Sequence, residues 1–264
     1  MKNYKIAVFG CGFVGGTVAD FLEQGGVEVT RVDPKLHPEN YPIDAILKTD
    51  GIIICVPTPS KEDGSCDDKH IKEVLKLCSY KERILLKSTV TPDLLSSYDN
   101  NVVYNPEFLR EASAKEDFAN QHIQIFGHHD NMYDDAVWWA DLFNEIHTKP
   151  ITTEFTNRET ASMIKYTHNA WLATKVAWFH ELYSAIQPEV NYGTLSSVLG
   201  KFPTIGSTHM LVPNSLGTLG YSGSCFPKDL KALTNEVNHS ILKYVVKVNE
   251  TLLTKEVTNG KTNN

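Results

Sequence analysis

The sequence lacks the cysteine pattern of a disulfide framework or of a zinc site. Its five cysteines are odd in number, lie far apart and include no C-x-x-C pair. Disulfide-stapled secreted domains carry an even number of cysteines, and structural zinc sites take theirs in pairs. We therefore expect no bound metal and a reducing, cytoplasmic location.

Long apolar runs and basic clusters are missing as well. No stretch of 18 apolar residues occurs, and residues 4–9 read as a strand rather than as a leader peptide, so we expect neither a signal peptide nor a membrane span. The formal net charge is −7 and Lys and Arg form no stripe, which argues against nucleic acid or an anionic membrane as a partner. The 264 residues are enough for one large domain or two smaller ones.

The first part of the chain alternates short apolar runs with helix-like segments. This alternation predicts βαβ units and an α/β fold, a Rossmann-like doubly wound parallel sheet, over residues 1–156. Strands are expected at residues 4–9, 27–33, 51–56, 83–87, 102–104 and 122–126, and helices at 18–24, 69–77 and 133–144.

A single long helix is predicted next. From Asn157 about 30 residues follow without Pro or Gly, opening with an N-cap residue and ending before Pro188. Because apolar residues occupy nearly all of its sides, we expect it to be buried against the domain and against a second subunit, in a homodimer. Lys165 and Asn169 lie one turn apart on it, where they either pair structurally or serve a ligand.

Shorter elements complete a small all-helical domain over residues 157–253. We expect a helical pair at 193–202, a loop at 209–220 and a last helix at 240–253. A polar tail at 254–264 follows.

A glycine-rich turn follows the first strand. Gly10, Gly12 and Gly15 match G-x-G-x-x-G and lead into a helix, so that a backbone loop and a helix N-terminus can hold a pyrophosphate. Asp33 ends the second strand about 20 residues later and suits a ribose diol. These features favour NAD over NADP, whereas Lys35, if it faced the ribose, would accept a 2′-phosphate.

Polar segments follow later strands at the edge where open α/β sheets bind ligands. Residues 56–59 (VPTP) form a rigid loop, and residues 87–90 (KSTV) bring hydroxyl groups to the same edge. In residues 105–111 (NPEFLRE), Glu107 and Glu111 would share a face of a helix. The segment is either a solvated acidic turn or a substrate loop in which one carboxylate transfers a proton.

Cys225 stands between a glycine-rich approach and Pro-Lys-Asp. Pro227 suits a first helical turn, so Cys225 falls at a helix N-terminus, where the helix dipole and Lys228 favour a thiolate. The alternative is that Cys225 is a small buried hydrophobic residue.

Five segments, in this order behind the glycine motif, resemble the UDP-glucose/GDP-mannose dehydrogenase family over about residues 4–250: VPTP, KSTV, NPEFLREASAKEDF, KYTHNAWLATKV and SGSCFPKDLKAL. The resemblance implies an enzyme that oxidises C6 of a nucleotide sugar, first among the candidates UDP-glucose, to the uronic acid for polysaccharide biosynthesis. Two hydride transfers to NAD would occur. Cys225 would attack the aldehyde to give a thiohemiacetal, whose oxidation leaves a thioester for water to hydrolyse.

The resemblance also implies roles for single residues. Lys165 and Asn169 would stabilise the oxyanion at C6. Asp229 and Thr89 would orient a water, and Glu107 would be the general base in thioester hydrolysis. The cofactor contacts would be Gly10, Gly12, Phe13, Val14, Gly15, Asp33, Lys35, Val56, Pro57, Thr89, Glu111 and Lys228, and the substrate contacts Glu107, Phe108, Leu109, Arg110, Lys165, Asn169, Tyr221, Gly223 and Cys225.

The sequence departs from the family pattern in several places. Thr204 precedes Ile-Gly where the family has an arginine that reaches a neighbouring subunit's sugar, Ser222 replaces a usual glycine, and the approach at 214–219 is longer. The family's third, nucleotide-binding domain would only begin near residue 264, so we expect a short form without it.

Two other functions stay open from the sequence. A single-step dehydrogenase of the 3-hydroxyacid or 6-phosphogluconate type shares the fold without needing a cysteine. A degenerate, non-catalytic NAD-binding module would have lost its sugar site and would act by association.

Overall fold

The computed structural model describes residues 3–81, 83–99, 101–214, 217–238 and 240–255. They form two compact units, one of the residues up to Lys61 together with Cys66–Lys165, the other of Glu62–Ser65 and the residues from Tyr166 onward. The boundary falls within the predicted long helix. Most of the predicted tail at 254–264 lies outside the described residues, as do two residues, Ser215 and Leu216, of the approach to Cys225.

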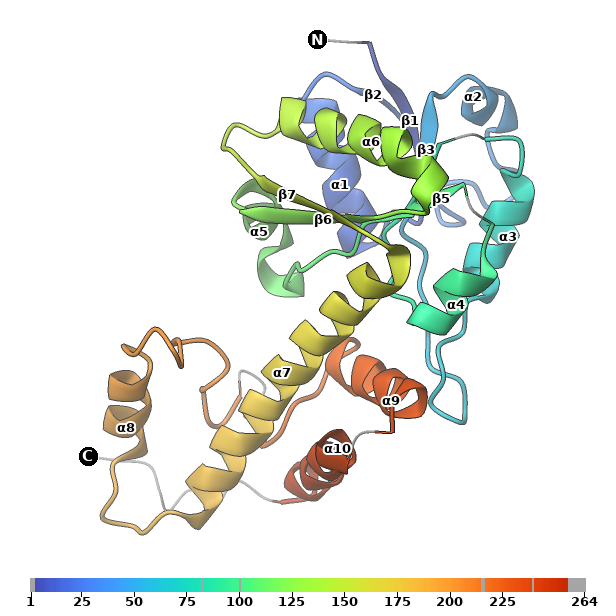
Figure 1. Cartoon of the computed structure of the whole chain (residues 1–264). Coiled ribbons are helices and arrows are strands. Elements are labelled where there is room, and N and C mark those ends of the chain that lie inside the picture. The colour runs from blue at the N-terminus through green and yellow to red at the C-terminus, as the bar shows by residue number, and fades with distance from the viewer. Residues whose placement is uncertain (1–2, 82, 100, 215–216, 239, 256–264) are drawn as a thin grey trace. The chain divides into compact units, whose positions relative to one another are not determined.

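The first unit is built on a seven-stranded sheet with the order β2-β1-β3-β4-β5-β6-β7. Figure 1 shows helices on both sides of it. The strands are β1 (Lys5–Phe9), β2 (Glu28–Val32), β3 (Gly51–Ile54), β4 (Ile84–Leu86), β5 (Val102–Tyr104), β6 (Ile123–Gly127) and β7 (Thr152–Thr156). The helices are α1 (Phe13–Gln24), α2 (Ile43–Leu47), α3 (Lys69–Leu77), α4 (Pro92–Ser97), α5 (Ala114–Ala119) and α6 (Tyr133–Ile146), with short 3₁₀ turns η1 (Glu111–Ser113) and η2 (Asp130–Met132).

The central strands are apolar on both faces, and this is why helices cover both. In β1, Ala7 and Phe9 belong to the core formed with α2, α3 and α4. Ile6 and Val8 belong to the core formed with α1, α5 and α6. Successive residues of a strand point to opposite faces, so a continuous apolar run suits a strand that is buried on both sides. The predicted Rossmann-like doubly wound fold is confirmed.

The sheet is not parallel throughout. β5 and β6 pair antiparallel through Tyr104 and Gly127, whereas the other neighbouring strands are parallel. The prediction of a parallel sheet is therefore wrong at this pair. To join two parallel strands, the chain must return from the end of the first strand to the opposite edge of the sheet. The segment between β5 and β6 does not return, and β6 therefore starts at the edge where β5 ends. The sequence reasoning also missed β7, in which four of the five residues are polar and Phe155 is the one apolar residue.

The second unit is helical. It contains most of α7 (Arg158–Ala185), followed by α8 (Tyr192–Leu199), α9 (Phe226–Glu236) and α10 (Ser240–Leu253), and no strand occurs among its described residues from 166 onward. Asn157 accepts a hydrogen bond from the Thr160 N–H at 2.7 Å, so the predicted N-cap of the 28-residue α7 is confirmed. α8 is one helix rather than the predicted pair, since helical structure ends at Leu199.

The core of this unit lies among α7, α8 and α10. Phe179 and Tyr183 of α7 pack with Tyr192 of α8 and with Leu252 of α10. The expectation that α7 is buried against the domain and against a second subunit stays a prediction, since only one chain is present and part of α7 is exposed in it. Trp171 and Trp178 are 63% and 65% exposed.

Candidate functional site

The glycine turn between β1 and α1 has a shape that only glycine permits. A Cβ on Gly15 would lie 1.9 Å from the Gly10 carbonyl oxygen, and Gly10 has φ +81° with its own Cβ position 2.8 Å from the Cys55 carbonyl oxygen. At Gly12, by contrast, nothing lies within 4 Å of the Cβ position, so this side of the turn is open. α1 starts there at Phe13 with no side-chain cap. Free N–H groups at an open helix N-terminus fit a pyrophosphate.

Asp33 lies beside this turn, as the sequence predicted. Its Oδ2 accepts a hydrogen bond from the Cys11 N–H at 2.8 Å, and its Oδ1 accepts one from the Lys35 N–H at 2.9 Å. The carboxylate is thus fixed at the end of β2 next to the glycine turn, where it fits a ribose diol. The Lys35 residue itself is exposed.

The loops after β3 and β4 are tied to each other. The Ser88 hydroxyl donates to the Val56 carbonyl at 2.7 Å, and the Thr58 hydroxyl donates to the Thr89 carbonyl at 2.8 Å. Parallel strands end at the same edge, so both loops lie at the edge where such sheets bind their ligands. Among the predicted contacts here, Val56 and Thr89 are half-buried and Pro57 is exposed.

Lys87, between β4 and the Ser-Thr pair, is a buried residue that the sequence reasoning did not single out. Its ammonium donates to Asn105 Oδ1 at 2.6 Å and lies 5.5 Å from the centroid of the Phe143 ring. Burial lowers the pKa of Lys87 to about 8. Asn105 in turn donates to the Ile125 carbonyl at 2.7 Å. The start of the 105–111 segment is therefore anchored to β4 and β6.

Glu107 and Lys165 form a buried ion pair in this unit. Lys165 Nζ lies 3.4 Å from Glu107 Oε1, and the two side chains are 5% and 10% exposed. The other carboxylate oxygen of Glu107 accepts from the Leu109 N–H at 2.6 Å. The Lys165 ammonium also lies 5.2 Å from the centroid of the Phe108 ring. The structure thus joins a predicted base, a predicted oxyanion donor and two predicted substrate contacts.

The idea that Glu107 and Glu111 share a helix face is not realised. Residues 105–110 are not helical, and Glu111 is exposed at the start of η1. Arg110 pairs with Asp117 at 2.6 Å and holds the pKa of that carboxyl at about 2. The N–H groups of Leu109 and Arg110 donate to the carboxylates of Glu107 and Asp117 at 2.6 and 2.9 Å, so side-chain acceptors take the place of the carbonyl acceptors of a helix.

Cys225 is the N-cap residue of α9, as predicted, with Pro227 in the first turn. Its thiol is half-buried and lies 3.7 Å from the Ser224 hydroxyl. The Asp229 N–H donates to the Cys225 carbonyl at 2.9 Å, which closes the first turn of the helix. The alternative of a fully buried structural cysteine does not describe this residue.

Asp229 is locked in place one turn after the cysteine. The carboxylate is 2% exposed; one oxygen accepts from Asn169 Nδ2 and the other from Lys228 Nζ, each at 2.6 Å. Three predicted residues from α7 and α9 therefore meet. Lys228, predicted as a cofactor contact, is bound here to its neighbour.

The remaining predicted contacts are divided between the units. Tyr221 is buried and Gly223 is exposed in the segment before Cys225. Phe13 and Val14 are half-buried at the start of α1.

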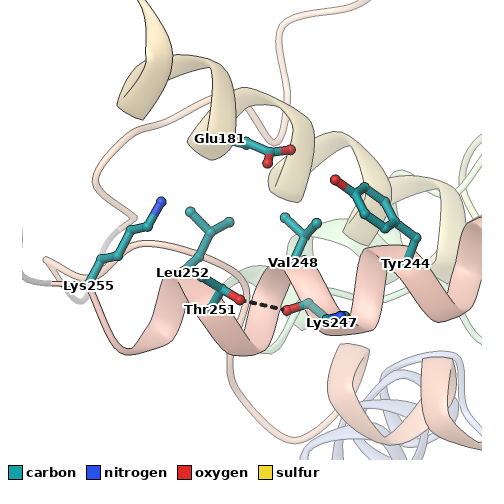
Figure 2. Close-up of a pocket in the computed structure, with 7 residues that line it drawn as sticks. All are labelled: Glu181, Tyr244, Lys247, Val248, Thr251, Leu252 and Lys255. Atoms are coloured by element: carbon teal, nitrogen blue, oxygen red, sulfur yellow. Dashed lines mark hydrogen bonds between the residues drawn. The ribbon is translucent and has the colours of Figure 1, made fainter.

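Neither of two cavities in the second unit is lined by a predicted catalytic residue. One, of about 170 Å³, lies between α7 and α10 and contains Glu181, Tyr244 and Lys247 among its walls (Figure 2). The other, of about 330 Å³, lies beside the exposed Trp171 and Trp178. The predicted catalytic side chains instead meet in the Glu107–Lys165 and Asn169–Asp229 contacts.

The sheet order, the glycine turn and Asp33 together define a Rossmann-type dinucleotide-binding protein with a helical second unit. Two family models match the chain. Residues 35–147 match the UDP-glucose/GDP-mannose dehydrogenase family NAD binding domain, and residues 159–251 match the central domain of that family. The chain belongs to the UDP-glucose/GDP-mannose dehydrogenase family, and its cofactor is NAD. The glycine turn and Asp33 precede the matched range, so their fit to NAD stands on the geometry above.

Individual relatives agree with this assignment. A protein named UDP-glucose 6-dehydrogenase from Rickettsia felis is 34% identical over 78% of this chain and 48% of its own length. YtcA of Bacillus subtilis is 31% identical over 94% of this chain and 68% of its own. A solved UDP-glucose dehydrogenase from Pyrobaculum islandicum shares the fold with a TM-score of 0.79 at 24% identity, over 94% of this chain and 68% of its own.

The chain spans between about a third and two thirds of the length of the relatives it matches. Among the residues that the structure describes, no helix has the length and apolar character needed to cross a membrane.

Proposed function

We propose that this chain oxidises a nucleotide sugar, UDP-glucose first among the candidates, at C6 to the uronic acid in two steps that each reduce one NAD. One observation carries the proposal. On α9, whose N-cap residue is Cys225, the buried Asp229 carboxylate accepts hydrogen bonds from both Asn169 and Lys228. A single-step dehydrogenase or a cofactor-binding module needs no thiol at that place. The names of the similar proteins support the same reaction.

Cys225 supplies the covalent step. Its thiolate attacks the C6 aldehyde, a carbon–sulfur bond forms, and the carbonyl oxygen becomes an oxyanion. NAD, when bound, accepts the hydride in each oxidation, the second of which converts the thiohemiacetal to a thioester.

Lys165 and Asn169 stabilise the oxyanion. Both carry donors on buried positions of α7, with 4% and 5% of the residue exposed, so their hydrogen bonds are not weakened by water. Asn169 uses its amide for Asp229 at 2.6 Å, which fixes the orientation of the side chain and leaves its second N–H for the substrate.

Water completes the reaction by hydrolysing the thioester. We assign Glu107 as the base that takes the proton of this water, because one of its oxygens faces Lys165 at the loose distance of 3.4 Å. Asp229 and Thr89 orient the water. The carboxylic acid product and the free thiol then leave the enzyme ready for a new cycle.

Counting NADH tests the reaction class. A panel of UDP- and GDP-sugars is offered with NAD, and two NADH per sugar are expected for one substrate. The Cys225→Ser variant should form no uronic acid, whereas the matched control Cys78→Ala, which changes a buried cysteine of the first unit, should keep the parent rate. One NADH per substrate with an active Cys225→Ser variant would support a single-step dehydrogenase, and NAD binding without turnover would support a non-catalytic module.

We further propose a homodimer formed through α7, working in the cytoplasm. Trp171 and Trp178 lie two turns apart on α7, are 63% and 65% exposed, and border a groove of about 330 Å³. Exposed indole groups at helical spacing suit the same helix of a second copy. Sedimentation of the parent and of Trp178→Glu tests this, since the charge should yield a monomer.

A further inference from the structure

The backbone just before Cys225 is held by two buried side chains from two different helices. His180 of α7 is 1% exposed and Asn249 of α10 is 4% exposed. The Gly220 N–H donates to His180 Nδ1 at 2.8 Å. The Tyr221 N–H donates to Asn249 Oδ1 at 2.6 Å, and Asn249 Nδ2 donates to the Tyr221 carbonyl at 3.0 Å. Both backbone polar groups of Tyr221 and the amide of Gly220 are thereby fixed.

These contacts determine the proton position on His180. The Gly220 N–H is a donor, so Nδ1 must offer a lone pair, and the proton of a neutral ring then sits on Nε2. Nε2 lies 3.0 Å from the Leu211 carbonyl and donates to it. The ring bridges the loop at Leu211 and at Gly220. A second proton on Nδ1 would face the Gly220 N–H and break this bridge.

The surroundings of His180 favour the neutral form. Burial lowers its pKa, and the hydrogen bond to the Leu211 carbonyl acts in the opposite direction. Both ring nitrogens are occupied by backbone groups. Within two turns of His180, α7 carries the titratable side chains Lys175, Glu181 and Tyr183; α10 carries Lys243, Tyr244, Lys247 and Glu250, and the loop carries His209 and Tyr221.

Gly220 allows Asn249 to approach this closely. Its φ is +81°, and a Cβ there would lie 2.6 Å from Asn249 Oδ1. After Tyr221, three exposed residues lead to Cys225 at the start of α9. We call the hydrogen bonds of His180 and Asn249 to Gly220 and Tyr221 the clamp. The Cys225 thiol therefore follows a short segment that is fixed at one end by the clamp and at the other end by α9.

We propose that His180, as the neutral ring protonated on Nε2, and Asn249 are positioning residues that place the Cys225 thiol for its reaction. The chemistry of the thiol rests on the proposed function, but the clamp itself does not. If the clamp opens, the link regains its conformational freedom and the thiol loses its fixed direction at the helix start.

The test compares four variants. His180→Phe and Asn249→Leu remove the clamp, whereas His180→Gln keeps one acceptor and one donor on a flexible side chain. Val245→Ala is the matched control, because it opens a space at a buried position of the same helix α10 and leaves the hydrogen bonds of Asn249 to Tyr221 in place. Amide hydrogen exchange at Gly220 and Tyr221 is measured together with the second-order rate of Cys225 alkylation and with kcat and KM.

We expect the protection factors at Gly220 and Tyr221 to fall at least tenfold in His180→Phe and Asn249→Leu but not in Val245→Ala. kcat should fall at least tenfold with KM for NAD unchanged, and His180→Gln should recover most of both losses. In the parent, protection at Gly220 should also fall as the pH drops below 6.5, the ordinary pKa of histidine, and this dependence should vanish in His180→Gln.

Two results would overturn the proposal. In the first, the protection factors at Gly220 and Tyr221 do not change in His180→Phe and Asn249→Leu. In the second, these factors fall but neither the alkylation rate of Cys225 nor kcat changes. Failure of the proposed function looks different. In that case Cys225→Ser keeps its activity while the exchange and alkylation results still follow the clamp.

Discussion

The two units hold their key carboxylates in different ways. Asp229, in the helical unit, is bound on both oxygens by side chains at 2.6 Å and is 2% exposed. Glu107, in the sheet unit, has its ammonium partner at 3.4 Å and receives one backbone N–H on the other oxygen. A carboxylate that is saturated with donors serves to orient its partners, whereas a loosely paired one remains available for a proton. The contrast supports a positioning task for Asp229 and a base task for Glu107.

Removing the Asp229 carboxylate should have the largest effect on stability. Asp229→Ala leaves the Lys228 ammonium and the Asn169 amide without their acceptor, and breaking a buried pair in this way costs about 3–5 kcal/mol. Urea denaturation of this variant beside Glu107→Ala measures the difference. Equal losses in the two variants would remove the distinction between a locked and a loose carboxylate.

Lys87 should give the sheet unit a stability that rises with pH. Its pKa is about 8 when folded and 10.5 ordinarily, so between these values the unfolded chain binds more protons and each rise in pH favours the folded state. Below pH 8, where Lys87 is charged in both states, its burial lowers the stability of the folded state by about 3 kcal/mol. This cost decreases as the pH rises toward 10.5.

Denaturation of the parent and of Lys87→Met across this pH range checks the expectation. The rise should be absent in the variant, whatever the variant's stability at a single pH, because a methionine side chain does not titrate. A parallel pH dependence in both proteins would assign the effect to other groups.

Glu107→Gln should slow turnover strongly. The amide oxygen still accepts from the Leu109 N–H, but the buried Lys165 ammonium loses its carboxylate partner, so we also expect the free energy of unfolding to fall by about 1–3 kcal/mol. Loss of a general base typically slows a reaction by about 10²–10⁴. Rapid mixing should show fast NADH formation followed by slow release of the uronic acid, and a variant that releases acid at the parent rate would rule out this role.

Local patterns account for the parts of the fold that the sequence predicted well. The helices at 69–77 and 240–253 and the strand at 102–104 occur within the predicted bounds, because apolar spacing, prolines and glycines act over a few residues. The same holds for Cys225 at its helix start. The helix face that Glu107 and Glu111 would have shared does not form, because the Arg110 N–H donates to the side chain of Asp117, a partner outside the segment.

The residues that were missed are those whose meaning depends on distant partners. Lys87 reads in the sequence as a polar residue at a strand end, but Asn105 and Phe143 enclose it. His180 and Asn249 read as single polar positions in two apolar helices. A hydrogen bond between segments that lie 28 or 40 residues apart leaves no local periodicity, so the pattern alone does not reveal it.

By itself, the sequence determined the doubly wound α/β class, the glycine turn with Asp33, the long helix and the place of Cys225, because each follows from short-range sterics and apolar spacing. Only the tertiary structure decided the direction of β6, the exposure of Trp171 and Trp178, the lock on Asp229 and the clamp before Cys225. These features depend on which groups meet after the chain has packed, when burial removes water and each donor must find a particular acceptor.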